Sequence, residues 1–389
     1  MKSSSRSDST EQFFATCPRG LEASLATELS SLGGGNTQAA DGGVAFAGTL
    51  ETMYRCNLGS RIASRILWRI GGGRYRNEED LYRAANALDW QRFFPVECTL
   101  RVNIAAIASP LTSLEFATLR IKDAICDRFR ADLGRRPDVD TANPDVRIHA
   151  FLNRQDYSLY LDTSGDALFK RGYRREAGEA PLRENLAAGI LQLSGWHPSE
   201  PLFDPMCGSG TFLIEAARMA SGIAPGAGRA FGFERLMNFD QALWTRVRDD
   251  SKPRRDEIDS QISGSDIDAL AVQGAARNFE QAGVAGRIRV AAADILTAAA
   301  PADHGVMVMN PPYGVRLEQD AGKLALFYPR LGDALKKNFA GWRAYIFTGD
   351  LRLPKLIGLA PSKRTPLFNG AIECRLYEFK LVSGSMRKK

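Results

Sequence analysis

The chain has 389 residues, of which 44% are hydrophobic, so it can bury more than one core and the length favours two or three domains. Its formal net charge of +6 permits a polyanionic partner but does not require one. Its apolar stretches are too short for a membrane span, and its six dispersed cysteines argue against a structural metal site and a disulfide framework, which favours the cytosol as its compartment.

The first 165 residues predict a mixture of helices and strands. Residues 1–10 are polar and Ser-rich, and we expect them to be disordered. A short strand at 13–16 precedes an amphipathic helix, which ends at three glycines, 33–35. The region contains no dinucleotide-binding or nucleophile motif, so we expect it to bind rather than to catalyse. Further strands are predicted at 44–46, 65–70, 99–107, 145–152 and 157–162, and further helices at 53–63, 78–94 and 113–133.

A charged, Gly-containing stretch at 166–181 is the expected linker, and strands alternate with helices beyond it, over 182–385. That alternation predicts a doubly wound parallel sheet. Near the end of the chain, an Asn369-Gly370 turn between two apolar runs predicts a β-hairpin, which would add an antiparallel edge. Residues 222–259 interrupt the alternation, and we interpret them as an insertion over one edge of this sheet.

The sequence Asn310-Pro311-Pro312-Tyr313 follows an apolar run, 306–309, which predicts a buried strand that opens into a loop at its carboxyl end. Ligands bind at that end of open α/β sheets. The Asn310 side-chain oxygen and the Pro311 carbonyl can accept both hydrogens of an exocyclic base amine, and Tyr313 can stack on the base. We therefore predict these four residues as catalytic, for an amine of guanine, adenine or cytosine.

Three acids, Asp204, Asp266 and Asp294, each follow a predicted strand, and a Gly-rich loop begins at the first of them. The loop has neither P-loop nor dinucleotide-binding spacing. Asp204 suits a cationic amino-acid group, Asp266 can accept hydrogen bonds from both hydroxyls of a ribose, and Asp294 can accept one from an adenine amine. This set fits S-adenosylmethionine better than NAD. Each acid alone is equally compatible with a helix cap. The predicted cofactor contacts are Asp204, Pro205, Met206, Cys207, Gly208, Gly210, Thr211, Asp266, Ile267, Asp294, Ile295 and Asn310.

These motifs resemble those of class I S-adenosylmethionine-dependent amino-methyltransferases. The wider pattern resembles the bacterial 23S ribosomal RNA guanine-N2 methyltransferases that carry a THUMP domain, and it includes Arg19-Gly20-Leu21-Glu22 and Arg171-Gly172-Tyr173-Arg174. The resemblance implies a Rossmann-like methyltransferase domain with a seven-stranded, mostly parallel sheet, preceded by an α+β RNA-binding region. Some family members continue into a second methyltransferase domain, and we expect no second activity here. The implied ranges are 11–70 for a ferredoxin-like region, 71–165 for the THUMP domain and 182–385 for the methyltransferase domain.

The implied function is methylation of guanine N2 in 23S ribosomal RNA or in a large-subunit assembly intermediate. Two alternatives stay open. A DNA adenine-N6 methyltransferase would use the same loop, and a non-catalytic, cofactor-sensing RNA-binding protein could serve ribosome assembly. We expect no metal and no membrane as partners. The predicted phosphate contacts are Arg65, Arg69, Lys170, Arg171, Arg174 and Arg175.

Overall fold

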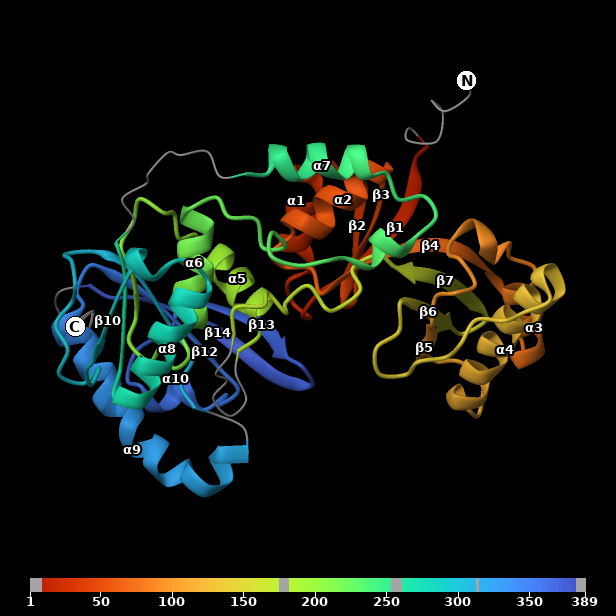
Figure 1. Cartoon of the computed structure of the whole chain (residues 1–389). Coiled ribbons are helices and arrows are strands. Elements are labelled where there is room, and N and C mark those ends of the chain that lie inside the picture. The colour runs from red at the N-terminus through yellow and green to blue at the C-terminus, as the bar shows by residue number, and fades with distance from the viewer. Residues whose placement is uncertain (1–8, 175–181, 253–260, 313–314, 383–389) are drawn as a thin grey trace. The chain divides into compact units, whose positions relative to one another are not determined.

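The computed structural model describes residues 9–174, 182–252, 261–312 and 315–382, which form two units (Figure 1). The first unit consists of residues 1–16, 26–168 and 229–250, and the second of residues 17–25, 169–228 and 251–389. Residues 1–8, Arg175 and Tyr313, on which several predictions fall, lie outside the described residues. Within the described residues, no helix is both long enough and apolar enough to cross a membrane.

A seven-stranded sheet organises the first unit, in the order β2-β3-β1-β4-β7-β6-β5. Only β5 and β6 pair in parallel. The long strand β4 pairs with β1 on one side and β7 on the other, so one sheet runs through both the expected ferredoxin-like and THUMP regions. The strands are β1 (Glu11–Thr16), β2 (Gly35–Ala40), β3 (Gly43–Gly48), β4 (Arg65–Arg74), β5 (Leu100–Ile107), β6 (Val146–Asn153) and β7 (Asp156–Asp162).

Helices α1 (Glu22–Ser31), α2 (Leu50–Gly59), α3 (Glu78–Asn86) and α4 (Leu114–Leu133) connect these strands. Local sequence sets their ends. The Ser113 side chain accepts the Phe116 N–H at 3.1 Å to start α4, and Gly134 ends the helix with a left-handed φ of +73°. Buried residues alternate with partly exposed ones along β6, so one face of the sheet packs on the core and the other faces outward.

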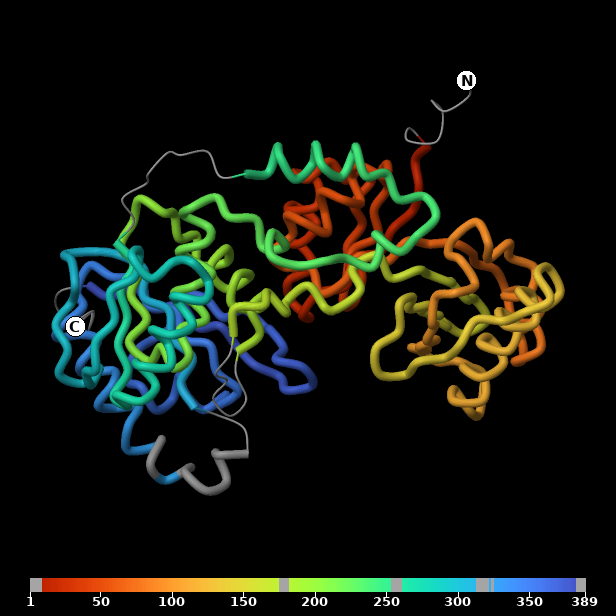
Figure 2. The backbone as a smooth tube through the Cα atoms, viewed as in Figure 1, coloured from red at the N-terminus to blue at the C-terminus, as the bar shows by residue number. Residues whose placement is uncertain are grey.

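Residues 229–250 of the expected insertion belong to the first unit. They contain a 3-10 helix, η2 (Gly232–Arg235), and a helix, α7 (Gln241–Asp250), and Figure 2 traces α7 beside α2. The Tyr54 ring lies 4.5 Å from the Phe233 ring and 5.6 Å from the Trp244 ring, and its hydroxyl accepts the Asp240 N–H at 2.9 Å. Burial raises the pKa of Tyr54 to about 12. The prediction that this segment lies over an edge of the parallel sheet is wrong for residues 229–250, because its aromatic side chains are buried against α2.

The second unit contains a mixed sheet in the order β10-β9-β8-β11-β12-β14-β13. The first five of these strands are parallel, and the β13–β14 hairpin adds the antiparallel edge, so the predicted fold class is confirmed. Pro366 lies in β13, where an edge strand tolerates its missing N–H. The strands are β8 (Leu202–Asp204), β9 (Ile262–Asp266), β10 (Ile288–Ala292), β11 (Gly305–Met309), β12 (Trp342–Thr348), β13 (Lys363–Asn369) and β14 (Ile372–Lys380).

The centre of this sheet is buried on both faces, as parallel strands require. Val306 through Met309 of β11 are completely inaccessible to solvent, and the Phe203 ring of β8 stacks on Phe339 with centroids 5.8 Å apart. This packing fixes the strand ends from which the candidate site is built. The helices are α5 (Glu184–Leu193), α6 (Thr211–Ala220), α8 (Ala269–Gln281), α9 (Val315–Asn338) and α10 (Leu353–Leu356), with a 3-10 helix η3 (Ala285–Arg287).

Replacing Trp244 by alanine should lower the free energy of unfolding by about 3–5 kcal/mol, because a large buried ring is removed from the cluster around Tyr54. Denaturant unfolding measures this change, and hydrogen exchange of the α2 amides should accelerate. Arg246→Ala, at an exposed position of the same helix, is the matched control and should change little. Equal stability of the Trp244→Ala and wild-type proteins would contradict the described packing.

Candidate active site

Four candidate side chains lie at the carboxyl ends of neighbouring parallel strands. Asp204 ends β8 and Asp266 ends β9, while Asp294 and Asn310 closely follow β10 and β11. The strand order β10-β9-β8-β11 therefore brings residues from distant parts of the sequence to one edge of the sheet. The chain reverses its winding between β8 and β11, and such a switch point is where open α/β sheets bind ligands.

The Gly-rich loop after β8 is tied to the end of β9. The Cys207 N–H donates to the Ser265 carbonyl, and the Gly208 N–H donates to Oδ2 of Asp266, both at 2.9 Å. Gly208 has a left-handed φ of +51°, and a Cβ added there would meet no atom within 4 Å. The Gly208 backbone therefore borders open space, so a ligand can approach it closely.

Gly210 serves packing instead. Its φ is +79°, and a Cβ added there would lie 2.4 Å from the ring of Phe279. The Ser209 carbonyl accepts the Asn278 side-chain amide at 3.1 Å, which anchors the loop to α8. Gly208 and Gly210 thus support one loop for different reasons, ligand approach and helix packing.

The carboxylate of Asp204 is buried and lacks a cationic partner among the described residues. It is 1% exposed, and its Oδ1 accepts the Met206 N–H at 3.2 Å. Burial, reinforced by the negative charge of Asp266, raises its pKa well above the usual range. A buried carboxyl of this kind suits a ligand that brings a positive charge.

Asp266 and Ile267 provide polar and apolar surfaces side by side. Oδ1 of Asp266 accepts the Asp268 N–H at 3.0 Å. Each carboxylate oxygen keeps a lone pair that can accept a hydrogen bond from a hydroxyl group. The Ile267 side chain is 74% exposed, which is unusual for isoleucine and suits contact with a flat ring. Oδ1 of Asp294 accepts the Leu296 N–H at 2.9 Å, which leaves the second carboxylate oxygen for another donor.

Several predicted cofactor residues are buried in the domain. Ile295 packs in the core with Met309, so its side chain is not available to a ligand and only its backbone is. Cys207 is buried, which raises the pKa of its thiol, and Pro205 is also buried. The Thr211 hydroxyl accepts a hydrogen bond from Arg174 at 2.9 Å. The loop sequence predicts the segment, but it does not separate residues that can line a site from residues that support the loop.

Asn310 carries an acceptor that the protein itself does not use. Its Oδ1 is buried and has no hydrogen-bond partner among the described residues. A buried carbonyl oxygen without a donor costs free energy, roughly 1–3 kcal/mol, so it is expected where a ligand supplies the donor. The strand that leads to Asn310 lies beside the strand that ends at Asp204, because β11 pairs with β8.

Two of the arginines predicted to contact phosphate, Arg171 and Arg174, are engaged by groups within the methyltransferase unit. Arg171 is 5% exposed and its Nε lies 3.7 Å from Oε1 of Glu215. Arg174 lies 3.4 Å from Glu184 and donates to the Leu182 carbonyl and the Thr211 hydroxyl, both at 2.9 Å. These contacts engage both guanidinium groups within the unit, which argues against the predicted phosphate role.

The sequence analysis missed the partners of these arginines. Glu215 lies within the apolar helix α6 and also accepts the Tyr173 hydroxyl at 3.0 Å, and burial raises the pKa of Glu184 in α5. An acid within an apolar helix is a sign of a buried charge that needs a partner. The position of Glu215 in the sequence therefore indicates an ion pair, but only the fold shows which cations lie close to its carboxylate.

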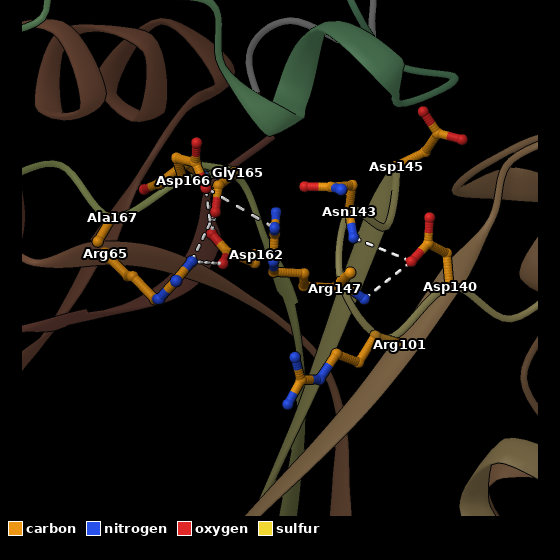
Figure 3. A network of polar contacts seen from close by, with 12 residues as sticks. Arg65, Arg101, Asp140, Asn143, Asp145, Arg147, Asp162, Gly165, Asp166 and Ala167 are labelled. Atoms are coloured by element: carbon orange, nitrogen blue, oxygen red, sulfur yellow. Dashed lines mark hydrogen bonds and ion pairs between the residues drawn. The ribbon is translucent and has the colours of Figure 1, made fainter. Parts of the chain in front are cut away.

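Arg65 is also engaged inside the protein, in the first unit. Its guanidinium donates to the buried carboxylate of Asp162 and, at 2.6 Å, to the Gly165 carbonyl (Figure 3). These contacts argue against the predicted phosphate contact of Arg65 as well. Arg69 and Lys170 are exposed, as a phosphate contact requires.

The described features fit the parts of S-adenosylmethionine. Asp204 suits its cationic amino-acid group, Asp266 its ribose, and Ile267 and Asp294 its adenine. A solved structure, SMU.472 complexed with S-adenosylhomocysteine, is 34% identical to this chain with a TM-score of 0.87, and the match covers 97% of this chain and 99% of that one. The fold and the site define a class I methyltransferase with S-adenosylmethionine as its cofactor.

The domains also match known families. Residues 171–378 match the RMKL-like methyltransferase domain, residues 75–162 the THUMP domain and residues 12–67 the RlmL ferredoxin-like domain. The chain belongs to the RMKL-like methyltransferase family. It is 40% identical to slr0064 of Synechocystis sp., which carries the provisional name of an RNA methyltransferase, over 96% of this chain and 98% of that protein.

A second relative is the ribosomal RNA large subunit methyltransferase K/L of Shewanella baltica (strain OS195), which is 41% identical over 97% of this chain. The match covers 54% of that protein. The chain therefore spans about half the length of the K/L relatives that it matches.

Asp204→Asn should weaken cofactor binding by about 2 kcal/mol or more, because a buried charge loses its counterpart. The same change should raise the melting temperature of the ligand-free protein above pH 6. The pKa of Asp204 is higher in the folded protein than in the unfolded chain. The wild-type protein therefore loses stability as the pH rises from the ordinary aspartate range through the pKa of the folded state. Asparagine does not ionise, so the variant does not lose this stability.

Calorimetry with S-adenosylhomocysteine and thermal unfolding at pH 5 and pH 8 measure both effects. Asp294→Asn, at a less buried acid, is the control for replacing a carboxylate by an amide and should change the stability of the ligand-free protein little. Unchanged cofactor affinity in Asp204→Asn would refute the assignment of Asp204.

Arg174→Ala should raise the dissociation constant of the cofactor, because Arg174 joins Glu184 to the first residue of α6 beside the Gly-rich loop. It should also destabilise the domain by about 3 kcal/mol or more, since Glu184 loses its partner. Cofactor titration and unfolding measure these changes. The opposite pattern, normal cofactor affinity with a smaller salt dependence of RNA binding, would restore the phosphate role of Arg174.

Proposed function

We propose that this protein methylates an exocyclic base amine of ribosomal RNA, and that the target is guanine N2 of the large-subunit RNA. The observation that carries the proposal is the buried, unpartnered Oδ1 of Asn310, at the switch point beside Asp204. The THUMP domain and the name of the K/L relatives support RNA as the substrate. The choice of guanine N2 rests on the resemblance, because other base amines present the same NH2 group.

An exocyclic amine is a poor nucleophile, since its lone pair is delocalised into the ring. Bound S-adenosylmethionine supplies a methyl group on a positively charged sulfur. The role proposed for Asn310 is to accept one amine hydrogen on Oδ1 while the Pro311 carbonyl accepts the other. Held in this way, the amine turns its lone pair toward the methyl donor, so catalysis comes from orientation and fixed dipoles.

No strong base is required of the protein, because the amine nitrogen becomes acidic as it is methylated. The target base has to leave a helix or to be single-stranded before it reaches Asn310. The role proposed for Tyr313 is to replace the lost stacking. Among the predicted phosphate contacts that the structure describes, Arg69 and Lys170 are exposed and are the candidates proposed for that role.

Asn310→Ala should lower the rate of methyl transfer by about a hundredfold or more, because the amine loses a positioned acceptor. Single-turnover transfer of labelled methyl to large-subunit RNA measures the rate, and nucleoside mass spectrometry identifies the methylated base. Affinity for S-adenosylhomocysteine should stay close to that of the wild type, which serves as the internal control. A near-normal rate in Asn310→Ala would refute the role of Asn310.

The same assay decides between the proposal and its alternatives. Methyl-adenine formed in duplex DNA, with none in RNA, would favour a DNA adenine-N6 methyltransferase. Tight cofactor and RNA binding by the wild-type protein without any transfer would favour the non-catalytic assembly protein.

A further inference from the structure

Strands β4 to β7 of the first unit have two unlike faces. One face is packed, and α4 contacts the neighbouring strand β5. The β6 residues buried on this face are Val146, Ile148, Ala150 and Leu152. The alternate side chains of β6, Arg147, His149 and Phe151, are partly exposed on the other. An open sheet face next to a packed one is a surface available for a ligand.

The strand register aligns one row of polar and aromatic side chains across this open face. Arg69 of β4 is opposite Tyr160 of β7, Tyr160 is opposite His149 of β6, and His149 is opposite Asn103 of β5. Side chains directly opposite each other on neighbouring strands point to the same face. Arg101 lies two residues before Asn103 on β5, on the same face, and is opposite Arg147 of β6. Arg69 therefore lies at one end of the row and Arg101 beside the other end.

The charge on this face is positive after its internal ion pairs are considered. Arg65 pairs with the buried Asp162, whose carboxylate also lies 3.6 Å from Nε2 of His149, and Arg147 lies 3.8 Å from Asp166. Figure 3 shows Arg101 and Arg147 on adjacent strands, with the acids Asp140, Asp145 and Asp166 in the adjoining loops. Arg101 donates to the Thr141 carbonyl at 2.6 Å, and neither Arg69 nor Arg101 has a carboxylate partner among the described residues.

We propose that the row Arg69, Tyr160, His149 and Asn103, with Arg101, binds single-stranded RNA. This inference rests on the proposed function and places a substrate contact outside the catalytic site. The rings of Tyr160 and His149 can stack on unpaired bases, the Asn103 amide can pair with a base edge, and the two arginines can contact phosphates. A duplex hides its bases, so it would leave the rings of this row unused.

The size of the row agrees with a short single strand. Four neighbouring strands span about 14 Å, at a spacing of about 4.8 Å per strand. That distance accommodates two or three nucleotides, as on other sheets that stack bases. Phe151, on the same face of β6, extends the apolar surface beyond the row.

The test uses the full-length protein and a fluorescent single-stranded oligonucleotide of the large-subunit RNA. Tyr160→Ala should weaken its binding about tenfold or more, since base stacking on an aromatic ring is lost. Tyr160→Phe keeps the ring and should bind as the wild type does. Arg69→Ala and Arg101→Ala should each lower the slope of log affinity against log salt by about one.

Arg130→Ala is the matched charge control, because Arg130 is an exposed arginine on α4 and pairs with Asp127. It should bind single-stranded RNA as the wild type does. A hairpin duplex of equal length should respond little to Tyr160→Ala. Equal losses for duplex and single strand, or equal binding by Tyr160→Ala and Tyr160→Phe, would overturn the inference, as would a loss in Arg130→Ala as large as in Arg69→Ala.

Methyl transfer by the same proteins separates this inference from the proposed function. If the wild-type protein methylates RNA and Tyr160→Ala binds it normally, the inference fails and the proposed function stands. If the wild-type protein transfers no methyl group to RNA, the proposed function fails, while the binding series still decides the role of this face. Thermal unfolding of each variant confirms that a loss of binding is not a loss of fold.

Discussion

The pairing of β8 with β11 is the constraint on which the candidate active site depends. It places the loop that begins at Asp204 beside the loop that begins at Asn310, although these residues are far apart in the sequence. The buried apolar residues of β11 and the Phe203–Phe339 stack hold both strand ends in place. Hydrophobic packing below the site therefore holds the two strand ends together, and the Gly208–Asp266 hydrogen bond ties the first loop to the end of β9.

The site keeps polar groups buried without satisfying them. Asp204 has no cationic partner among the described residues, and the Asn310 oxygen has no donor there. Both arrangements cost stability in the ligand-free protein, and under the proposed function the cationic group of the cofactor and the base amine would supply the missing partners. Elsewhere in the same domain, buried charge is paired, as the contacts of Arg174 with Glu184 and Thr211 show. The contrast separates groups that serve ligands from groups that serve the fold.

The arginines show why charge in a sequence is a weak guide to nucleic-acid contacts. Arg65, Arg171 and Arg174 occur in charged stretches, yet each is directed at a buried acid or at a carbonyl group of the same unit. Arg101 and Arg147 were not predicted as RNA contacts, because each is an isolated cation in a separate strand. The parallel register of β5 and β6 places them side by side. Cation clusters on a sheet arise from pairing between strands, which linear spacing does not report.

Local patterns in the sequence determined the alternation of strands and helices, the terminal hairpin, the two functional loops and, through resemblance, the family. These features depend on neighbouring residues, since side-chain periodicity and turn chemistry are local. Tertiary structure alone decided which loop residues line the site, which arginines are buried, where residues 229–250 pack and which face of the first sheet stays open. Each of these depends on residues distant in the chain, and the burial of Trp244 against Tyr54 and the exposure of Arg101 follow from such contacts.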